Sequence, residues 1–569
     1  MLLQRSKPEV LRMFLPKRES YETLIRDFRW EIPENFNIGR AVADDWAERE
    51  PDRLALEHFS PDGRHRRLTY GQLRDRSNRF AHALVAMGVR PGDRVALLLP
   101  QSFATVIAHV AIYKAGAIAL PLALLFGADA LEYRLKDSGA VAVVTNAFGH
   151  AKLADIRAGL PDLRHVVVTG ADIPGTATFE TILRTYPGTF DIVDSSKDDP
   201  ALMIYTSGTT GPPKGALHAH RVLPGHVPGV QMAQEYMPQP DDKFWTPSDW
   251  AWAGGLLNCL LPSLMMGVPV VSSPAQKFDP HLAFRIMAET GVRNAFIPPT
   301  ALRLMMQVDK PRATYDLRLR SIGSAGESLG REAYEWARRT LGITVNEFYG
   351  QTECNIVLGS MAGLGVTRAG AIGRVTAGHE VAIVGEDGQE LPRGTAGQIA
   401  VRRPDPVMFL GYWNNPPATG KKFVGDWMLT GDQGVMDDEG YVEFFGRDDD
   451  VITSSGYRIG PAEIEDCLIA HPAVRLAAAV GKPDPLRTEI VKAYIVLAEG
   501  VPPSTALAAD IRDWVKHRLS MHEYPREVEF IDALPMTTTG KVIRRLLRDR
   551  AAEEARNPSV PEPARRAAH

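Results

Sequence analysis

The sequence predicts an α/β fold class: a large N-terminal domain of layered α/β subdomains with a β-rich subdomain, then a small mobile α+β C-terminal domain. Short runs rich in Val, Ile and Ala alternate with helical patterns, which is typical of parallel sheets covered by helices. The chain has 569 residues, which is too long for one core. A polar run, 446-GRDDDVITSSGYRIG-460, marks the boundary, so we expect domains at 1–448 and 449–569.

The elements expected in the N-terminal domain follow one another closely. An amphipathic helix over 103–114 and another over 129–139 separate buried strand patterns. The predicted strands are 94–100, 117–122, 141–146, 164–170, 201–208, 269–273 and 292–299. Between 371 and 446 the pattern changes to strands joined by Gly/Asp turns, which predicts the β-rich subdomain. Its strands are expected at 380–391, 398–404 and 441–447.

The C-terminal domain is predicted to be compact and α+β. A helix is expected over 461–470, with Pro near its first turn and acidic residues early. Strands over 474–481 and 490–498 and a helix over 506–520 follow. The tail 551–569 is rich in Ala, Pro and charge, and we expect it to be frayed.

Composition excludes several classes of protein. Hydrophobic residues make up 44% and charged residues 24%, and the net charge of −4 gives no reason to expect a nucleic-acid partner. Three widely spaced cysteines form neither a zinc motif nor a disulfide framework. The N-terminus has no signal-peptide core, and the longest apolar stretches are interrupted. We therefore expect a cytoplasmic protein without a membrane span.

The stretch 205-YTSGTTGPPKGALHAH-220 follows a predicted strand and has the composition of a phosphate-binding loop. Glycines let backbone N–H groups face an anion, the hydroxyls add donors, and Lys214 adds a mobile positive charge. A Gly/Thr-rich surface loop is the alternative. A P-loop would close with Gly-Lys-Ser/Thr before a helix, whereas this lysine follows two prolines. A P-loop NTPase is therefore not expected.

Further polar turns follow along the chain, each weak by itself. They are 324-SAGESLG-330, 347-EFYGQTEC-354, 429-LTGD-432 and 535-PMTTTGK-541. Asp432 follows a turn, where its carboxylate is placed to accept hydrogen bonds from ribose hydroxyls. Lys541 lies on a polar turn, and a solvated surface lysine is the alternative.

Taken together and in this order, these motifs resemble the adenylate-forming superfamily of acyl-CoA synthetases, adenylation domains and luciferases. The resemblance covers about 35–550. SGYRIGPAEIE, GESL and YGQTE are most similar to the medium-chain acyl-CoA synthetases. The resemblance implies that a carboxylate attacks the α-phosphate of ATP to give acyl-adenylate and pyrophosphate, after which the thiol of coenzyme A displaces AMP.

The resemblance also assigns residues to the nucleotide and Mg²⁺. Glu353 stands at the position of the Mg²⁺-ligating glutamate, which suits a hard cation that prefers oxygen ligands. The residues implied to bind the nucleotide are Thr206, Ser207, Gly208, Thr209, Thr210, Gly211 and Lys214 for the phosphates; Gly326, Glu327, Ser328 and Tyr349 for the adenine; Asp432, Arg447 and Arg458 for ribose or phosphate; and, without a closer assignment, Glu347, Phe348, Gly350, Gln351 and Thr352. Thr206, Lys214, Glu353 and Lys541 are the implied catalytic residues.

Lys541 matches the lysine that bridges the carboxylate and the α-phosphate, where it would neutralise two anions and orient their approach. The family rotates its C-terminal domain between half-reactions, and Asp449 matches the hinge position. Rotation would bring Ser455, Gly456 and Tyr457 toward the pantetheine channel. Arg487 and Lys516 are weaker candidates for coenzyme A phosphates, with surface charge as the equal alternative.

The acyl pocket departs from the acetyl-CoA synthetase pattern. Gly350 stands where those enzymes have a tryptophan that floors the acetate pocket, so longer or branched acids are expected to fit better. Trp252, Ala253, Gly254 and Ala325 are expected to line the same pocket, although Trp252 as plain core is the alternative. Ser328 replaces the proline of the acetyl-type motif, and Cys354 stands where Thr is common.

Three questions stay open at the level of the sequence. The acid is linear, branched or aromatic, and fatty acid metabolism is the expected context. An enzyme loading a carrier protein, a non-catalytic nucleotide-binding protein and, remotely, a luciferase-type oxygenase are the alternatives to a coenzyme A ligase. Related bacterial enzymes are switched off by acetylation of the matching lysine, so a lysine acetyltransferase and deacetylase acting on Lys541 are possible partners.

Overall fold

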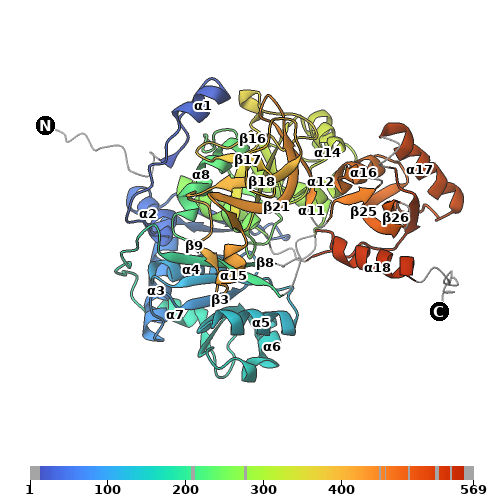
Figure 1. Cartoon of the computed structure of the whole chain (residues 1–569). Helices are drawn as coiled ribbons and strands as arrows, with labels where there is room; N and C mark the ends of the chain where they lie inside the picture. The colour runs from blue at the N-terminus through green and yellow to red at the C-terminus, as the bar shows by residue number, and fades with distance from the viewer. Residues whose placement is uncertain are drawn as a thin grey trace.

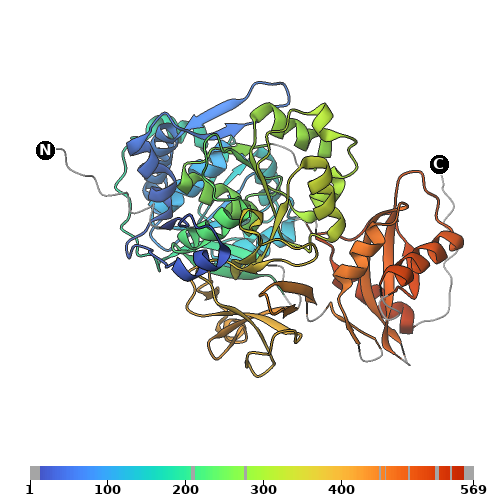
Figure 2. The ribbon, with the colours of Figure 1, turned by 90° about the horizontal axis from the view of Figure 1, so that it is seen from above.

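The computed structural model describes residues 13–206, 212–273, 278–447, 450–454, 457–484, 487–519, 524–537 and 541–556. The described strands form four sheets, of nine, eight, five and five strands. The first three sheets belong to the large N-terminal domain. The fourth belongs to the C-terminal domain, which lies at one side of the molecule in both views (Figures 1 and 2).

The eight-stranded sheet has a parallel centre because helical connections join its strands. In spatial order it contains β19 (Gly411–Tyr412), β9 (Lys214–Ala219), β8 (Pro200–Thr206), β4 (Ile118–Pro121), β3 (Arg94–Leu98), β5 (Ala142–Asn146), β6 (His165–Thr169) and β7 (Ala177–Thr178). Val95 and Leu97 of β3 pack in the core that contains α3 and α4, whereas Ala96 and Leu98 pack with α5 and α6 on the other face. Burial on both faces explains the continuous apolar pattern of this strand.

The nine-stranded sheet is likewise parallel in its centre. Its order is β16 (Arg374–Val375), β15 (Cys354–Gly359), β14 (Val345–Gln351), β13 (Ser321–Ser324), β12 (Asn294–Phe296), β10 (Phe244–Trp245), β11 (Val270–Ser272), β1 (Leu54–His58) and β2 (Arg66–Thr69). β13 pairs parallel with both β12 and β14, and β14 then turns back on β15 as an antiparallel hairpin. That hairpin carries 347-EFYGQTEC-354.

The β-rich subdomain is an antiparallel sheet, as its Gly/Asp turns predict. It contains β17 (Val381–Val384), β18 (Gly397–Arg402), β21 (Trp427–Met436) and β20 (Phe423–Val424), with β22 (Val442–Arg447) paired to β21. Alternate residues of β21 are buried, from Met428 to Met436, so one face of this strand contacts the core. Figure 2 shows the subdomain in gold to light orange, below the two large sheets.

The C-terminal domain packs helices against its own sheet. The strands are β24 (Tyr457–Ile459), β23 (Ile452–Ser454), β26 (Thr488–Leu497), β25 (Val474–Asp484) and β27 (Glu527–Phe530). The helices are α16 (Pro461–Ile469), α17 (Thr505–Arg518) and α18 (Arg544–Arg556). Ser504 caps α17 by accepting the Leu507 N–H, a typical helix start.

The helices of the N-terminal domain cover the two large sheets (Figure 1). They are α1 (Tyr21–Asp27), α2 (Asp45–Arg49), α3 (Tyr70–Ala86), α4 (Phe103–Lys114), α5 (Ala128–Ser138), α6 (Ala147–Ala154), α7 (Phe179–Thr185), α8 (Val222–Ala233), α9 (Ala253–Gly255), α10 (Leu261–Met266), α11 (Pro280–Thr290), α12 (Pro299–Met305), α13 (Pro311–Thr314), α14 (Arg331–Trp336) and α15 (Pro416–Gly420). The short π-helices η2 (Arg40–Asp44) and η4 (Leu256–Leu260) precede α2 and α10.

The α/β class and the two-part organisation are confirmed, with one correction at the chain end. Residues 551–556 are not frayed, because they form the last turns of α18 and Ala551 is fully buried. Leu547 packs in the same cluster, with Tyr494 of β26. Leu547 and Ala551 are four residues apart, which is a helical spacing. The prediction for the tail was made from its Ala- and charge-rich composition and did not use this spacing.

Candidate active site

The expected phosphate loop joins two paired strands. β8 ends at Thr206 and β9 begins at Lys214, and these two residues are register partners. The Thr206 hydroxyl donates to the Lys214 carbonyl at 3.5 Å, and the Lys214 ammonium lies 5.0 Å from the centre of the Tyr412 ring. The residues between, Ser207, Gly208, Thr209, Thr210 and Gly211, lie outside the described residues.

The turn after β13 carries the residues expected at the adenine. Glu327 accepts a hydrogen bond from the Thr300 hydroxyl at 2.7 Å and lies 3.6 Å from Arg303. Arg303 also donates to the Ser328 carbonyl at 3.1 Å. Gly326 has a φ of +103°, a conformation that a side chain disfavours. Thr300 and Arg303 of α12 therefore hold this turn in place.

The β14–β15 hairpin lies beside this turn. Glu347 is buried and accepts the Leu329 N–H at 3.0 Å, and burial raises its pKa to about 7. Phe348 packs against Phe296, with ring centres 5.5 Å apart. The hairpin and the turn thus form one continuous wall.

Glu353 follows Thr352 at the tip of the hairpin. It is buried, and its carboxylate accepts the hydroxyl hydrogen bond of Tyr412, on β19. Burial, and then the Glu353 charge, raise the pKa of Tyr412 above its usual range. This tyrosine belongs to the strand that pairs with β9, so Glu353 is tied to the phosphate-loop strands.

Asp432 lies on β21, opposite Arg447 of β22. Its carboxylate accepts the Tyr349 hydroxyl at 2.5 Å and the Gln351 amide at 3.4 Å, and the Arg447 guanidinium is 3.9 Å away. Burial raises the pKa of Asp432, whereas Arg447 lowers it. The structure therefore brings together the aspartate, arginine and tyrosine that the sequence assigned to the nucleotide.

Lys422 was missed by the sequence analysis. Its ammonium donates to the Gln351 side-chain oxygen at 2.8 Å and to the Thr430 carbonyl at 3.2 Å. Burial lowers its pKa, and the nearby carboxylates of Glu353 and Asp432 raise it. Tyr412 was missed as well, and no local motif marks either residue.

Lys541 reaches this wall from the C-terminal domain. Its Cε lies 3.5 Å, and its Nζ 4.0 Å, from where a Cβ on Gly326 would stand. Burial lowers the pKa of the ammonium, while Glu327 and Asp432 raise it. The Lys541 side chain therefore packs in van der Waals contact with the position of Gly326.

Two asparagines link the segments in which the acyl pocket was expected: Asn258, after Trp252–Gly254, and Asn355, beside Gly350. Trp252 is half-buried and packs edge-on against Phe126, with ring centres 5.6 Å apart. Asn258, six residues further on, accepts a hydrogen bond from the Asn355 amide at 2.6 Å. Ala253 and Ala325 belong to the same apolar cluster, as Phe296 does, and a Cβ on Gly254 would lie 3.0 Å from the Phe296 ring.

Gly350 differs from expectation in one respect. A Cβ at this position would lie 2.5 Å from both the Asn355 Cα and the Ile356 nitrogen. The hairpin's own backbone therefore occupies the direction in which we expected open volume. Glycine is required here by the close approach of β15, irrespective of the acid.

The remaining expected residues are in the C-terminal region. Asp449, Ser455 and Gly456 lie outside the described residues, as do the side chains of Tyr457 and Arg458 on β24. The Arg487 N–H is bonded to Asp484 within the β25–β26 hairpin. Lys516, on α17, lies 5.6 Å from the Tyr524 ring centre. Helix α17 lies at the side of this domain away from the N-terminal domain (Figure 1).

The donors present fit Mg²⁺ held jointly with a nucleotide. Among the described residues, no group of three His, Cys, Asp or Glu side chains forms a metal cage. Mg²⁺ is commonly bound by one or two carboxylates together with phosphates and water. Glu353, with one carboxylate oxygen bonded to Tyr412, offers such a ligand.

Comparisons with known proteins agree with this geometry. Residues 43–413 match the model described as AMP-binding enzyme, and residues 463–541 match that of the AMP-binding enzyme C-terminal domain. The chain belongs to the AMP-binding enzyme family. This adenylate-forming family also includes the acyl-CoA synthetases described next.

Relatives in this AMP-binding family match nearly the whole chain. Acetyl-coenzyme A synthetase of Bacillus subtilis (strain 168) is 34% identical over 93% of this chain and 95% of its own. The mitochondrial acyl-coenzyme A synthetase ACSM4 of Mus musculus is 33% identical, covering 91% of each. The structure of the anthranilate CoA ligase AuaEII with anthranoyl-AMP superposes with a TM-score of 0.85 at 29% identity, covering 92% of this chain and 99% of that one. In the part of this chain that the structure describes, no helix has the length and hydrophobicity to cross a bilayer.

Proposed function

We propose that this protein is an ATP-dependent, AMP-forming acyl-CoA synthetase. In the first step, an oxygen of the acid carboxylate forms a bond to the α-phosphorus, and the bond to the pyrophosphate oxygen breaks. In the second, the coenzyme A sulfur attacks the acyl carbonyl, its proton is released, and AMP leaves. The acid is a medium-chain, branched or aryl carboxylate.

The observation that carries the proposal is the position of Lys541. Its ammonium lies over Gly326 and within the electrostatic influence of Glu327 and Asp432. Negative charge accumulates where a carboxylate meets a phosphate, and a positioned cation there stabilises the transition state. The distant relatives, named as synthetases and ligases of coenzyme A, support the same reaction.

The other residues are assigned by their neighbours. Asp432 and Tyr349 would receive the ribose and adenine side of ATP, and Lys214 the departing pyrophosphate. Glu353 would hold Mg²⁺ together with ATP phosphates, and that cation supplies further neutralisation of charge. The thioester step would follow rotation of the C-terminal domain about Asp449, with Gly456 toward the pantetheine and Lys541 withdrawn.

Pyrophosphate release measured over linear C2 to C12, branched and aromatic acids tests the proposal. Release that depends on an added acid and on ATP, followed by thioester formation on free coenzyme A, is the expected result. Thioester formation only on a carrier protein would instead indicate an adenylation enzyme of that kind. No acid-dependent release with any acid would mean that the protein is not a synthetase.

The acid preference is best tested at Trp252. Gly350→Trp is unsuitable because its Cβ would meet the Asn355 backbone. Trp252→Ala removes an indole that packs on Phe126, so the preference among acids should shift toward larger ones. An unchanged order of kcat/KM over the series would place Trp252 in the core and outside the pocket.

Acetylation of Lys541 is proposed as a switch of this activity. The modification removes the positive charge that the first half-reaction requires. Incubation with a bacterial lysine acetyltransferase should modify Lys541 and abolish pyrophosphate release, and deacetylation should restore it. An unmodified lysine or unchanged release would contradict the switch.

A further inference from the structure

Lys541 belongs to a loop that is closed on itself. The Thr537 N–H donates to the Lys541 carbonyl at 2.7 Å, and the Lys541 N–H donates to the Thr537 hydroxyl at 3.0 Å. The Ile543 N–H donates to the Pro535 carbonyl at 2.8 Å. Lys541 is therefore bonded to residues of its own C-terminal domain. Its position over Gly326 depends on how that domain is docked.

A hydrogen bond between the domains lies at the far end of the adenine turn. Asp466, on α16 of the C-terminal domain, accepts the backbone N–H of Arg331 at 2.9 Å. Arg331 is the first residue of α14, which follows the turn directly. The first N–H groups of a helix have no partner within the helix, and here the partner comes from another domain.

The packing at this contact is close. Gly330 has a φ of +78°, and a Cβ there would stand 2.3 Å from the Asp466 Oδ1. Burial raises the pKa of Asp466, while backbone hydrogen bonding from Arg331 and Glu332 and the charges of Arg303 and Arg331 lower it. The Asp466 carboxylate is therefore closely packed against the backbone of Gly330 and Arg331.

The turn between Gly326 and Arg331 is consequently held from two domains. Arg303 and Thr300 bind it from the N-terminal domain, and Asp466 binds its end from the C-terminal domain. Lys541 packs on its beginning. A carboxylate and a lysine of one domain therefore contact opposite ends of a single turn of the other.

We propose that Asp466 is a positioning residue for adenylation: its bond to the Arg331 N–H docks the C-terminal domain so that Lys541 lies over Gly326. The assignment rests on the proposed function for its kinetic consequence. Because Lys541 serves the first half-reaction, loss of this bond should slow acyl-adenylate formation and leave the thioester step intact. Asp466 itself touches no reacting atom.

Two pairs of matched variants test the bond from both sides. Asp466→Ala removes the acceptor, whereas Asp466→Asn keeps an acceptor oxygen. Arg331→Pro removes the N–H at a helix position where proline is well tolerated, and the ψ of 151° at Gly330 suits a following proline. Arg331→Ala removes only the exposed side chain.

Acid-dependent ATP–pyrophosphate exchange should fall about ten-fold in Asp466→Ala and Arg331→Pro, as for the loss of a hydrogen bond to a charged group. Exchange should stay near the wild-type rate in Asp466→Asn and Arg331→Ala. Thioester formation from synthetic acyl-adenylate and coenzyme A should be unchanged in all four. The double variant Asp466→Ala/Arg331→Pro should be no slower than either single variant.

Equal losses in both half-reactions, or a loss in Arg331→Ala as large as in Arg331→Pro, would overturn the assignment. Amide hydrogen exchange provides a readout that needs no activity: the peptide over 329–336 should exchange faster in Asp466→Ala than in Asp466→Asn. Equal exchange in these two variants would also overturn it. A wild type that exchanges no pyrophosphate with any acid refutes the proposed function, and hydrogen exchange still decides the contact.

Discussion

Lys422 links the β14–β15 hairpin to strand β21 within the candidate site. Its ammonium bonds the Gln351 side chain of the hairpin and the Thr430 carbonyl beside Asp432. Two consecutive lysines occupy 421 and 422, and Lys421 is exposed. Nothing in the local sequence tells which of the two makes these hydrogen bonds, so tertiary packing alone assigns the role.

Lys422→Met should lower kcat/KM for pyrophosphate release about 10- to 100-fold, because it removes charge-assisted hydrogen bonds to the Gln351 side-chain oxygen and the Thr430 carbonyl. Lys421→Met, the same substitution at the neighbouring exposed position, is the control and should be close to wild type. Steady-state kinetics with one good acid measures both. Similar values for the two variants would show that Lys422 has no special role.

The burial of Glu347 makes the stability of the fold depend on pH. Its folded-state pKa of about 7 exceeds the ordinary value of 4.5 because the carboxyl is buried. Its contribution to stability is fully present below the unfolded pKa and is lost as pH rises to about 7. Glu347→Gln keeps an acceptor for the Leu329 N–H and abolishes this loss.

The free energy of unfolding of Glu347→Gln, relative to wild type, should therefore rise by roughly 2–3 kcal/mol between pH 5 and pH 8. Urea unfolding at a series of pH values measures the difference. Glu386→Gln, at an exposed position, controls for the loss of one negative charge. A difference that is constant with pH would show that Glu347 does not take up a proton on folding.

The elements of the N-terminal domain are locked together by a buried lysine. Lys114 ends α4 and is inaccessible to solvent; its ammonium lies 2.6 Å from Asp44 and donates to Ser77 and Asn78 of α3 at 3.0 Å and 2.7 Å. Burial lowers its pKa to about 8 despite Asp44. The apolar pattern of 103–114 predicts the helix but not this partner.

Lys114→Met should destabilise the fold by about 3–5 kcal/mol, because a buried carboxylate is left without its cation. Lys136→Met on the exposed surface of α5 should cost less than about 1 kcal/mol. Chemical unfolding gives both values. Adding Asp44→Leu to Lys114→Met should restore much of the loss, and a further loss would contradict the ion-pair explanation.

Sequence patterns predicted elements better than they predicted contacts. The helix over 103–114 has the expected bounds, and Ser102 caps it, but it is not amphipathic as predicted, because every residue from Thr105 to Lys114 is buried. The β14–β15 hairpin was not predicted, because 347-EFYGQTEC-354 has no alternating pattern and its register shifts between Tyr349 and Gln351. The filled space beside Gly350 follows from that hairpin, so it too required the structure.

At the scale of the whole molecule, the sequence predicted two domains but not what joins them. Motifs placed Lys541 and Asp432 in one site although 108 intervening residues separate their positions. Asp466 directly follows the SGYRIGPAEIE motif at the start of α16, but the motif itself does not indicate this contact. Distant polar contacts of this kind depend on docking geometry, which periodicity does not encode.

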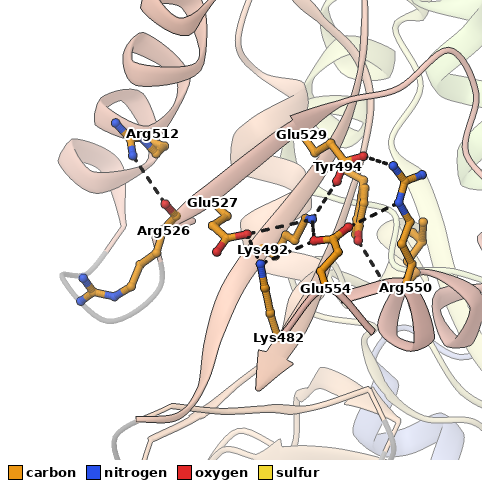
Figure 3. Close-up of polar contacts among 10 residues, drawn as sticks. Lys482, Lys492, Tyr494, Arg512, Arg526, Glu527, Glu529, Arg550 and Glu554 are labelled. Atoms are coloured by element: carbon orange, nitrogen blue, oxygen red, sulfur yellow. Dashed lines mark hydrogen bonds and ion pairs between the residues drawn. The ribbon is translucent and has the colours of Figure 1, made fainter. Parts of the chain in front are cut away.

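The C-terminal domain holds α18 through a cluster of charges centred on Lys492 (Figure 3). The Lys492 ammonium, nearly fully buried on β26, lies 2.7 Å from Glu529 of β27 and also contacts Glu554 of α18. Lys482 binds Glu527 at 2.7 Å and Glu554 at 3.5 Å. The carboxylates raise the pKa of Lys492 above its usual value against the effect of burial. Because α18 begins at Arg544, shortly after Lys541, this cluster fixes the helix that follows Lys541.

Lys492→Met should lower the stability of the C-terminal domain by about 3 kcal/mol, since Glu529 and Glu554 lose a buried partner. Arg550→Met, whose side chain is half exposed, should cost less than about 1 kcal/mol. Calorimetry should show the C-terminal transition of Lys492→Met moving to lower temperature while the N-terminal transition stays in place. Acid-dependent pyrophosphate exchange should then be lost over the lower transition, because the domain that carries Lys541 unfolds first while ATP binding to the N-terminal domain persists. A single transition shifted as a whole would mean that the two domains unfold as one unit, and it would refute a local role for the Lys492 cluster.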